Sequence, residues 1–442
     1  MTWSTLHCGQ TEWTGDPGGA ATEQPALGPQ ATITADAATG GAWQVVVIGA
    51  GPAGASAAVR LAAGGIRTLL IDRHAMPRRK VCGCCLSVSA DAELRSLGDT
   101  PAGAALASLQ RAPLETVRLL HRGRSVALPL AGGGVMSRET LDPALVRGAI
   151  AAGCDWLPGC QVATLDDSAV GGAAVDVVLS GGPGPLAGER RCVLRADYVV
   201  LATGLADQVR ITPARSPQSF ARSVASASRI GVGASLAATA LELPAGELVM
   251  AISRGGYCGL VRLENGCIDL AAAVDRAELT RHAEPAAAVA AIVAEAAGDG
   301  LDPVRFSSAV HSVRFQATPS LTRRAALVAG GSGRILRVGD AAGYVEPFTG
   351  EGIGWALAGG RLLATALLPQ QGGGLAPPAA VGLAYPRAHR RHFAAQHRRC
   401  QRVAGLIRRP AVVSAALQAA QAVPWVARRV VPAIVGAGVT TP

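Results

Sequence analysis

A glycine-rich turn between a hydrophobic segment and an alanine-rich segment constrains this chain most. Residues 45–48 read Val-Val-Val-Ile, which predicts a buried parallel strand, and they are followed by Gly-Ala-Gly-Pro-Ala-Gly. Residues 52–63 predict a helix that begins inside this turn. In such a unit Gly49 permits the tight turn, Gly51 lets a pyrophosphate approach the backbone, and Gly54 lets the helix pack against the strand. The segment therefore predicts a nucleotide-binding βαβ unit.

An acidic residue follows at the spacing that this unit requires. A second predicted strand, residues 68–71, ends in Asp72, about twenty residues beyond the turn, where a carboxylate can accept hydrogen bonds from a ribose. The N-terminus of the intervening helix offers free N–H groups and the positive end of its dipole to phosphates. These features predict a dinucleotide but do not separate NAD from FAD.

A second motif, almost three hundred residues further on, decides between the two cofactors. Residues 336–338 predict a strand that ends in Gly339 and Asp340, an acid placed to bind a second, sugar-like polyol. Residues 347–352, Pro-Phe-Thr-Gly-Glu-Gly, lead into a predicted helix at 353–368 whose first N–H groups are unpaired. A helix N-terminus beside a flavin pyrimidine ring stabilises the negative charge that develops there on reduction. Together the two motifs predict FAD.

The chain also resembles a known family. Residues 197–204, Asp-Tyr-Val-Val-Leu-Ala-Thr-Gly, resemble the segment that returns the chain to the nucleotide domain in flavoproteins of the p-hydroxybenzoate hydroxylase fold. Within that fold the segments 77–87, 137–142 and 347–353 are most similar to the geranylgeranyl reductase group. The resemblance covers residues 44–370. It implies an α/β fold: a Rossmann-like FAD-binding domain with an inserted antiparallel-sheet substrate domain, followed by a C-terminal helical tail.

The resemblance also implies a set of cofactor contacts. These are Gly54, Asp72, Cys82, Gly83, Arg138, Asp340, Gly352 and Ile353, with the strand around Val162 passing the adenine. A guanidinium fork such as that of Arg138 can hold phosphate or ribityl oxygens, the alternative being a surface arginine that caps a helix. The thiol of Cys82, in a loop against the flavin, is the candidate catalytic group that touches substrate or tunes the ring; a small packed residue is the alternative.

The expected activity is that of an FAD-dependent oxidoreductase that reduces or dehydrogenates an apolar isoprenoid-like or secondary-metabolite substrate. One departure is the aromatic-rich Tyr-x-x-Trp-x-Phe-Pro stretch of the reductase group, which reads Gly-Tyr-Cys-Gly-Leu-Val-Arg at 256–262. The alternatives are an NAD(P)H-dependent flavin monooxygenase of the aromatic hydroxylase type and a non-enzymatic flavin electron carrier. The Gly-Gly-Ser-Gly at 330–333 precedes a strand, so NAD(P)H or another reduced donor is expected to bind transiently without a fold of its own.

Charge is concentrated at the C-terminal end. The formal net charge is +10, and residues 352–442 contain eleven arginines but no Asp or Glu. Interspersed apolar residues predict basic amphipathic helices, which bind anionic membranes or pack one face on the core. We expect a cytoplasmic protein with a small apolar substrate and peripheral contact to the inner face of the membrane. With 3% aromatic residues and no reading motif, nucleic acid is not an expected partner.

The predicted organisation has four parts. Residues 1–43 are expected to be a disordered extension, residues 44–204 and 321–370 the FAD-binding domain, 205–320 the substrate domain, and 371–442 a linker and basic helical tail. Predicted strands at hairpin spacing mark the substrate domain: 229–236, 248–253, 257–264 and 268–274. The ten cysteines are expected to be reduced, and the cluster at 82–85 lacks a second pair at zinc spacing, so no metal site is predicted.

Overall fold

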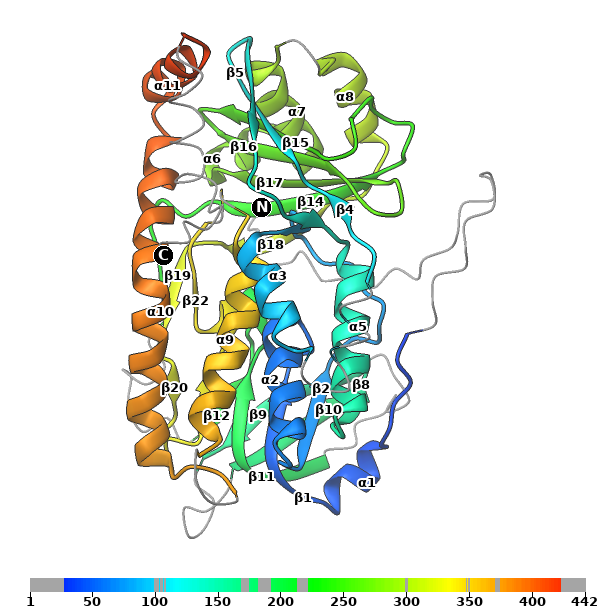
Figure 1. Ribbon diagram of the computed structural model, residues 1–442, viewed down its shortest axis with the longest axis vertical. Coiled ribbons are helices and arrows are strands. Elements are labelled where there is room, and N and C mark those ends of the chain that lie inside the picture. Colours follow the sequence, from blue (N-terminus) through cyan, green and yellow to red (C-terminus); the bar gives the residue numbers. More distant parts are fainter. Residues whose placement is uncertain are drawn as a thin grey trace.

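The chain folds around two main β-sheets, which lie one above the other in Figure 1, each covered by helices. The computed structural model describes residues 28–98, 103, 106, 109–167, 175–181, 192–212, 222–298, 301–346, 348, 350–369 and 374–422. The predicted α/β architecture, with a Rossmann-like sheet, a largely antiparallel second sheet and C-terminal helices, is confirmed.

The lower sheet is built around parallel strands. Among the described residues its main order is β12 (Arg210–Thr212), β9 (Cys160–Asp166), β10 (Val175–Gly181), β11 (Cys192–Leu201), β1 (Ala42–Ile48), β2 (Thr68–Asp72) and β8 (Asp155–Pro158). β21 (Ile335–Arg337) pairs with β11 and with β20 (Val328–Ala329). β1 has a parallel partner on each side, with Val46 opposite Leu69 and Val199. Because both faces of such a strand are buried, its sequence is a continuous β-branched run.

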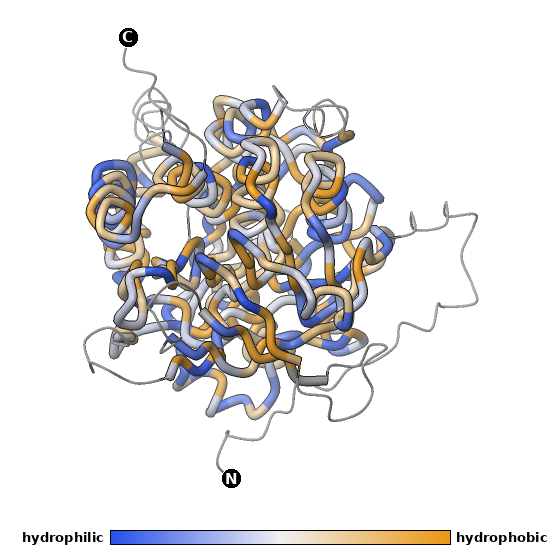
Figure 2. Tube along the Cα trace, turned by 90° about the horizontal axis from the view of Figure 1, so that it is seen from below, coloured by the Kyte–Doolittle hydropathy of each residue, from blue (hydrophilic) through white to orange (hydrophobic). Residues whose placement is uncertain are grey.

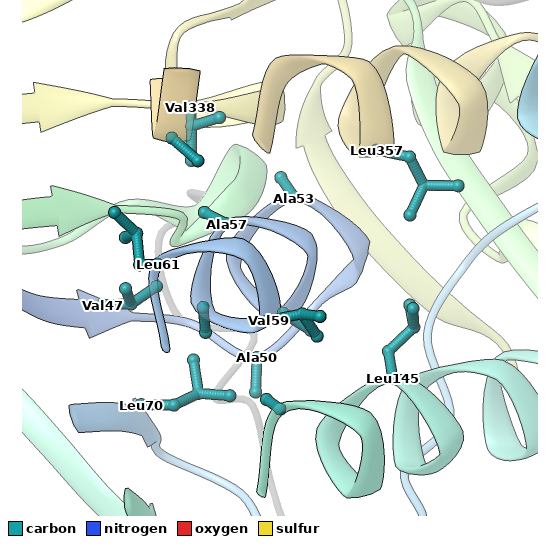
Figure 3. Close-up of a cluster of buried hydrophobic side chains, with 14 of the residues drawn as sticks. Val47, Ala50, Ala53, Ala57, Val59, Leu61, Leu70, Leu145, Val338 and Leu357 are labelled. Carbon is teal, nitrogen blue, oxygen red and sulfur yellow. The ribbon is translucent and has the colours of Figure 1, made fainter. Parts of the chain in front are cut away.

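Helices pack closely on one face of this sheet: α2 (Pro52–Ala63), α5 (Arg138–Ala151) and α9 (Gly352–Leu367). Figure 3 shows the small side chains of α2 between Val47 and Leu70 of the sheet, Leu145 of α5 and Leu357 of α9. Gly360 makes this approach possible, since a Cβ there would lie 2.5 Å from the carbonyl oxygen of Ala53. The distal motif is thereby held directly beside the glycine turn.

The segment before β1 corrects one prediction. Residues 28–43, expected to be part of a disordered extension, include the short helix α1 (Ala35–Thr39) and the start of β1. Ala38 and Trp43 are buried against the lower sheet, and the indole N–H of Trp43 donates to the carbonyl oxygen of Ala38 at 2.9 Å. Apolar contacts therefore order this part of the chain, and residues 1–27 lie outside the described residues.

The upper sheet carries the predicted hairpins. Its order is β18 (Gln316–Ser320), β14 (Ile230–Leu236), β17 (Ile268–Val274), β16 (Gly256–Arg262), β15 (Glu247–Ser253), β5 (Thr116–His121) and β6 (Arg124–Pro129). β16 ends two residues earlier than predicted, because the chain turns at Gly266, whose φ is +83°. One face packs on the helices α6 (Arg276–His282), α7 (Pro285–Ala296) and α8 (Pro303–His311), and the other faces the lower half of the molecule.

Two strands of the upper sheet come from a segment that the sequence assigned to the cofactor domain. β5 and β6 lie within residues 44–204, yet β5 pairs in parallel with β15, with Leu119 opposite Met250. The predicted division of the chain therefore differs from the sheet assignment at residues 116–129. The reason is that a parallel pair formed by segments this far apart leaves no local sequence signal.

Short elements connect the two halves. One small sheet contains β3 (Cys85–Leu86), β7 (Gly134–Val135) and β4 (Ala112–Pro113), and another contains β13 (Arg222–Val224), β19 (Arg323–Ala325) and β22 (Gly343–Tyr344). α3 (Val88–Arg95) follows β3, with Ser87 as its N-cap. β3 brings the cysteine loop under the upper sheet, where Cys84 is buried together with Val261.

The basic C-terminal segment forms two helices, α10 (Pro378–Leu406) and α11 (Pro410–Ala422). α10 runs along the side of the molecule past both sheets (Figure 1), and in the view from below it shows both hydrophilic and hydrophobic residues (Figure 2). Its buried residues are Val381, Tyr385, Phe393, Cys400 and Val403. Six arginines are exposed on α10 and directly after it: Arg387, Arg390, Arg391, Arg398, Arg402 and Arg409. Arg428 and Arg429 lie outside the described residues.

Candidate functional site

A cavity of about 1030 Å³ lies between the two main sheets. Ten of the twelve predicted site residues line it: Gly49, Gly51, Asp72, Cys82, Gly83, Arg138, Val162, Asp340, Gly352 and Ile353. The other two, Gly54 and Gly339, lie behind the cavity wall and allow the neighbouring backbone segments to pack closely. A Cβ on Gly54 would lie 1.9 Å from the carbonyl oxygen of Gly49, and one on Gly339 would lie 2.7 Å from the Cβ of Ala53.

The glycine turn has the geometry that the sequence predicts. Gly49 has a φ of +106°, and a Cβ there would lie 2.3 Å from the carbonyl oxygen of Ala202. Gly51 is open instead: the nearest atoms to a Cβ at this position are guanidinium nitrogens of Arg138, at 3.6 Å, and Arg78, at 3.9 Å. The backbone therefore leaves a gap between the turn and two cations.

Arg138 is a buried and fixed residue, which excludes the alternative of a surface cap. It begins α5, and its Nε and Nη2 donate to the two carboxylate oxygens of Asp142 at 2.8 Å each. Ser137 caps the same helix by accepting from the N–H of Thr140 at 3.1 Å. Burial opposes the charge on Arg138, but Asp142 and Cys82 together outweigh it and raise the pKa of the guanidinium above its usual range. Arg138 is therefore a permanent cation of defined orientation.

Arg78 completes this cationic arrangement. Its guanidinium lies 3.1 Å from Asp72 and 3.7 Å from Asp142. Its Nε is buried and has no hydrogen-bond partner within the described part of the chain. Because paired guanidinium groups bind phosphate oxygens well, Arg78 and Arg138 beside Gly51 fit a diphosphate.

Asp72 lies at the end of β2 and fixes the turn. One oxygen accepts from the N–H of Ala50 at 2.8 Å and the other from the N–H of His74 at 3.0 Å. Burial by itself opposes ionisation, but Arg78 and these hydrogen bonds outweigh it, so the pKa of Asp72 lies below its usual range. The carboxylate lines the cavity as an anion, in the place predicted for ribose binding.

The distal motif presents an acid and a helix N-terminus to the same cavity. Burial raises the pKa of Asp340, while Lys80, Arg138 and Arg323 oppose that shift. Gly352 and Ile353 begin α9, and the side chain of the N-cap residue Glu351 accepts no hydrogen bond from the first N–H groups of the helix. These donors remain for a bound group that gains negative charge.

The cysteine loop brings three thiols with different pKa values to the site. The Sγ of Cys82 accepts from the N–H of Cys84 at 3.4 Å, and Cys84 has a φ of +53°. The Cys84 thiol and the positive charge of Arg138 lower the pKa of Cys82 to about 6, although burial opposes them. Burial raises the pKa of Cys85 to about 12. Cys82 is therefore the thiolate of this loop at neutral pH.

The nine cysteines in the described part of the chain are all free. Within the same residues, no group of three or more His, Cys, Asp or Glu side chains is arranged to hold a metal ion.

The wall opposite the glycine turn is apolar. Alternate residues of β15 and β16 point into the cavity, among them Leu248, Met250, Tyr257 and Val261. Gly259 lies between them and allows close packing with Met250, since a Cβ at this position would lie 3.0 Å from the Met250 sulfur. Ala271 and Ala273 of β17, with Phe348 and Leu321, continue this wall. The cavity thus has a polar side that carries the cations and a larger apolar side.

These residues fit FAD. The open gap at Gly51 and the unpaired Nε of Arg78 suit the diphosphate, and Asp340 and the start of α9 suit the polyol and the ring. Sequence reasoning did not select Arg78, Lys80 or Asp142 as site residues. Arg78 and Lys80 were visible as a basic run before Cys82, and Asp142 as a carboxylate four residues after Arg138. The individual contacts of Val162 and the other predicted residues stay predictions.

Comparison with known proteins agrees with this site. A stretch of 54 residues is 52% identical to menaquinone reductase of Mycobacterium tuberculosis, and this match spans 12% of the chain and 13% of that relative. A flavoprotein/dehydrogenase from Cytophaga hutchinsonii superposes with a TM-score of 0.67 at 15% identity, covering 89% of this chain and 92% of the other. PqsL of P. aeruginosa, in complex with 2-aminobenzoylacetate, gives 0.64 at 16% identity, covering 84% and 98%.

These two structures show the fold. A family model described as "FAD binding domain" matches residues 42–378, which is most of the chain. The protein therefore belongs to the FAD binding domain family and is an FAD-dependent flavoprotein oxidoreductase.

Proposed function

We propose that this protein is a reductase of the geranylgeranyl reductase type, which adds hydrogen across, or removes it from, a carbon–carbon bond of an apolar substrate with an isoprenoid-like chain. The observation that carries the proposal is the apolar wall formed by β15, β16 and β17 opposite the flavin cradle. Leu248, Met250, Tyr257 and Val261 offer an unbranched hydrocarbon or an isoprenoid chain a continuous apolar surface. The small residues Gly259 and Ala271 in this wall leave room for such a chain.

The protein's contribution to this chemistry is to bind and orient. Arg78 and Arg138 would hold the diphosphate at the glycine turn, and Asp340 the ribityl hydroxyls. The N-terminus of α9 would stabilise negative charge at the end of the ring. When bound and reduced, the flavin supplies the two electrons of the reaction as a hydride. The apolar wall excludes water from the place where the double bond lies.

The local match to a menaquinone reductase supports the substrate class, because that relative's name describes a reductase and an isoprenoid quinone. The match covers 13% of that relative, so the substrate of this chain is our proposal. Counted from Tyr257, the missing Trp and Phe of the reductase-group motif fall at Leu260 and Arg262. These two residues alternate along β16 with Gly259 and Val261, which line the cavity.

Two alternatives remain candidates. A flavin monooxygenase would share the same cradle, and the neighbouring structures include a brominase and a peptidyl tryptophan dihydroxylase. A simple electron carrier would need a shallow polar flavin face, and the apolar wall argues against it. NAD(P)H is the proposed transient donor for either enzyme.

The test is product analysis with the FAD-loaded protein, NADPH or dithionite, and menaquinone with an unsaturated side chain, under nitrogen and under ¹⁸O₂. Two hydrogens added to a side-chain double bond under nitrogen, and still present after the quinone head group has been reoxidised, support the proposal. Incorporation of ¹⁸O into the product, with no reaction under nitrogen, would establish the monooxygenase instead.

We also propose peripheral contact with an anionic membrane surface. The six exposed arginines of α10 and its C-terminal end support it, together with Leu383 and Leu406, which are 77% and 48% exposed on the same helix. The opposite face of α10 is packed on the protein, so contact would occur through a docked helix. Within the described residues, no helix is both long and apolar enough to cross a membrane.

A further inference from the structure

One carboxylic acid faces the cavity from the apolar wall. Asp269 lies on β17, and it shares a face of that strand with Ala271 and Ala273. Val261 and Ser235 lie opposite it on the neighbouring strands. Asp269 is the one carboxylic acid among the described residues of β14, β15, β16 and β17 that line the cavity. Asp269 belongs to neither the glycine turn nor the distal motif.

Asp269 is buried without the partners that a structural carboxylate has. It is 8% exposed, and its Oδ2 has no hydrogen-bond partner in the described part of the chain. Buried carboxyl oxygens in proteins are almost always hydrogen-bonded, so an unpaired one in a cavity wall points to a group that binds there. The Cys84 thiol is a hydrogen-bonding neighbour of the same carboxyl group.

The surroundings keep Asp269 protonated. Burial raises the pKa of its carboxyl well above the usual range, the Cys82 thiolate raises it further, and Arg79 opposes both. The ionisable groups that face it come from the cysteine loop, α5 and β16: Arg79, Cys82, Cys84, Cys85, Glu139 and Cys258. Of these, Arg79 alone carries a positive charge, and it is exposed to solvent. At neutral pH the cavity wall therefore presents a neutral acid with a proton to give.

We propose that Asp269 is the catalytic acid that protonates the substrate double bond. The inference rests on the proposed reductase function. Saturating one double bond requires one hydride and one proton: the hydride comes from the reduced flavin, and the proton from the Asp269 carboxyl. The double bond is reduced, the flavin is oxidised, and Asp269 is left as a carboxylate that regains its proton from solvent before the next turnover. An apolar wall suits this step, because burial keeps the acid protonated at neutral pH until the substrate takes the proton.

The first test is spectroscopic and needs no substrate. Infrared spectra of the FAD-loaded protein at neutral pH should show the C=O stretch of a protonated carboxylic acid, which is lost in Asp269→Asn. A matched control is Glu242→Gln, since Glu242 lies at the surface of the same half of the molecule with a side chain 91% exposed. The control should keep the band. A wild-type spectrum without the band, or an unchanged spectrum of Asp269→Asn, would overturn the inference.

The second test separates the acid from the function. The dithionite-reduced holoenzyme is mixed anaerobically with unsaturated menaquinone, and saturation of the side chain in a single turnover is followed by the mass of the product after its quinone head group has been reoxidised. Asp269→Asn should bind FAD normally and react about 10²- to 10⁴-fold slower, the typical loss for a general acid. The wild-type rate should fall as pH rises through the raised pKa of Asp269, whereas the variant should show no such step.

Each outcome of the second test has a distinct meaning. Product from the wild type with an equal rate in Asp269→Asn would overturn the role of Asp269 and leave the reductase function standing. No reduced product from the wild type would overturn the function, and the proton-donor role with it. A slow variant whose pH profile keeps the wild-type step would assign the proton to another group and also overturn the inference.

Discussion

Substitution by alanine should weaken FAD binding at one glycine of the turn, Gly51, and lower the stability of the apoprotein at another, Gly49. Gly51 has a φ of −75° and a ψ of 179°, which alanine adopts freely, and a methyl group there meets nothing closer than 3.6 Å. Alanine at this N-cap costs a few tenths of a kcal/mol to about 1 kcal/mol, and the loss of unfolded-state entropy offsets about 0.4–1 kcal/mol of it. The free energy of unfolding of the apoprotein should therefore change by less than about 1 kcal/mol in Gly51→Ala.

Gly51→Ala should weaken FAD binding. The added methyl group would fill the gap between the turn and the guanidinium groups of Arg138 and Arg78, where we place the diphosphate. Loss of one charge-assisted hydrogen bond costs about 1.5–3 kcal/mol, and 1.4 kcal/mol is a factor of ten in affinity. The Kd for FAD should therefore rise about 10- to 100-fold in Gly51→Ala.

Gly49→Ala is the matched contrast. With a φ of +106° and a Cβ that would lie 2.3 Å from the Ala202 carbonyl oxygen, alanine here adds backbone strain of about 1–3 kcal/mol and a steric cost of similar size. Urea unfolding of the apoproteins and FAD titrations monitored by flavin fluorescence measure both quantities. If Gly51→Ala binds FAD as tightly as the wild type, or if Gly49→Ala is as stable as the wild type, the reasoning about this turn is refuted.

Four further predictions concern other parts of the molecule. The purified protein should be yellow and bind FAD rather than FMN, and Asp340→Ala should weaken FAD binding about tenfold or more in the same titration, whereas a colourless protein that cannot be reconstituted would contradict the site. Glu346→Gln leaves the buried Arg229, 2.9 Å away, without its main partner, so urea unfolding should show a loss of about 3 kcal/mol; a loss under 0.5 kcal/mol, on the order of a surface change, would be a failure. Burial lowers the pKa of His389 to about 4, so between pH 6.5, the ordinary pKa, and pH 4 the unfolded chain binds a proton that the folded chain does not. The free energy of unfolding should therefore fall by about 3 kcal/mol as pH drops from 6.5 to 4. His389→Gln should remove this pH dependence. Anionic vesicles at low salt should sediment the wild type, with each exposed arginine adding roughly 1 kcal/mol, and equal sedimentation of the variant with six Arg→Gln changes would contradict membrane contact through Arg387, Arg390, Arg391, Arg398, Arg402 and Arg409.

The sequence predicts the cofactor half of this protein well, because its constraints are local. The strand, the turn and the helix around Gly49 are contiguous, and each has a period or a glycine requirement that residues alone reveal. The same holds for the distal strand and helix, where predicted and observed ends differ by about one residue.

The substrate half depends on contacts that the sequence does not encode locally. β5 pairs with β15, which follows it in the chain by more than a hundred residues. Asp269 lies in a largely hydrophobic strand, so the sequence does not show which face of the sheet its side chain is on. The alternation of Asp269, Ala271 and Ala273 would have placed them on one face, but only the fold shows that this face lines the cavity. The basic C-terminal segment shows the same limit. Arg408, between α10 and α11, pairs with the buried Glu346 at 3.2 Å, and the net charge of the segment does not predict this contact.

The most direct measurement of the central claim is an experimental structure of the FAD-loaded protein with a bound menaquinone whose side chain is saturated. We predict density for the FAD diphosphate between Gly51 and the guanidinium groups of Arg78 and Arg138, and density for the apolar chain along Met250 and Val261. Binding of the quinone outside this cavity, with the wall of β15, β16 and β17 left uncovered, would contradict the account.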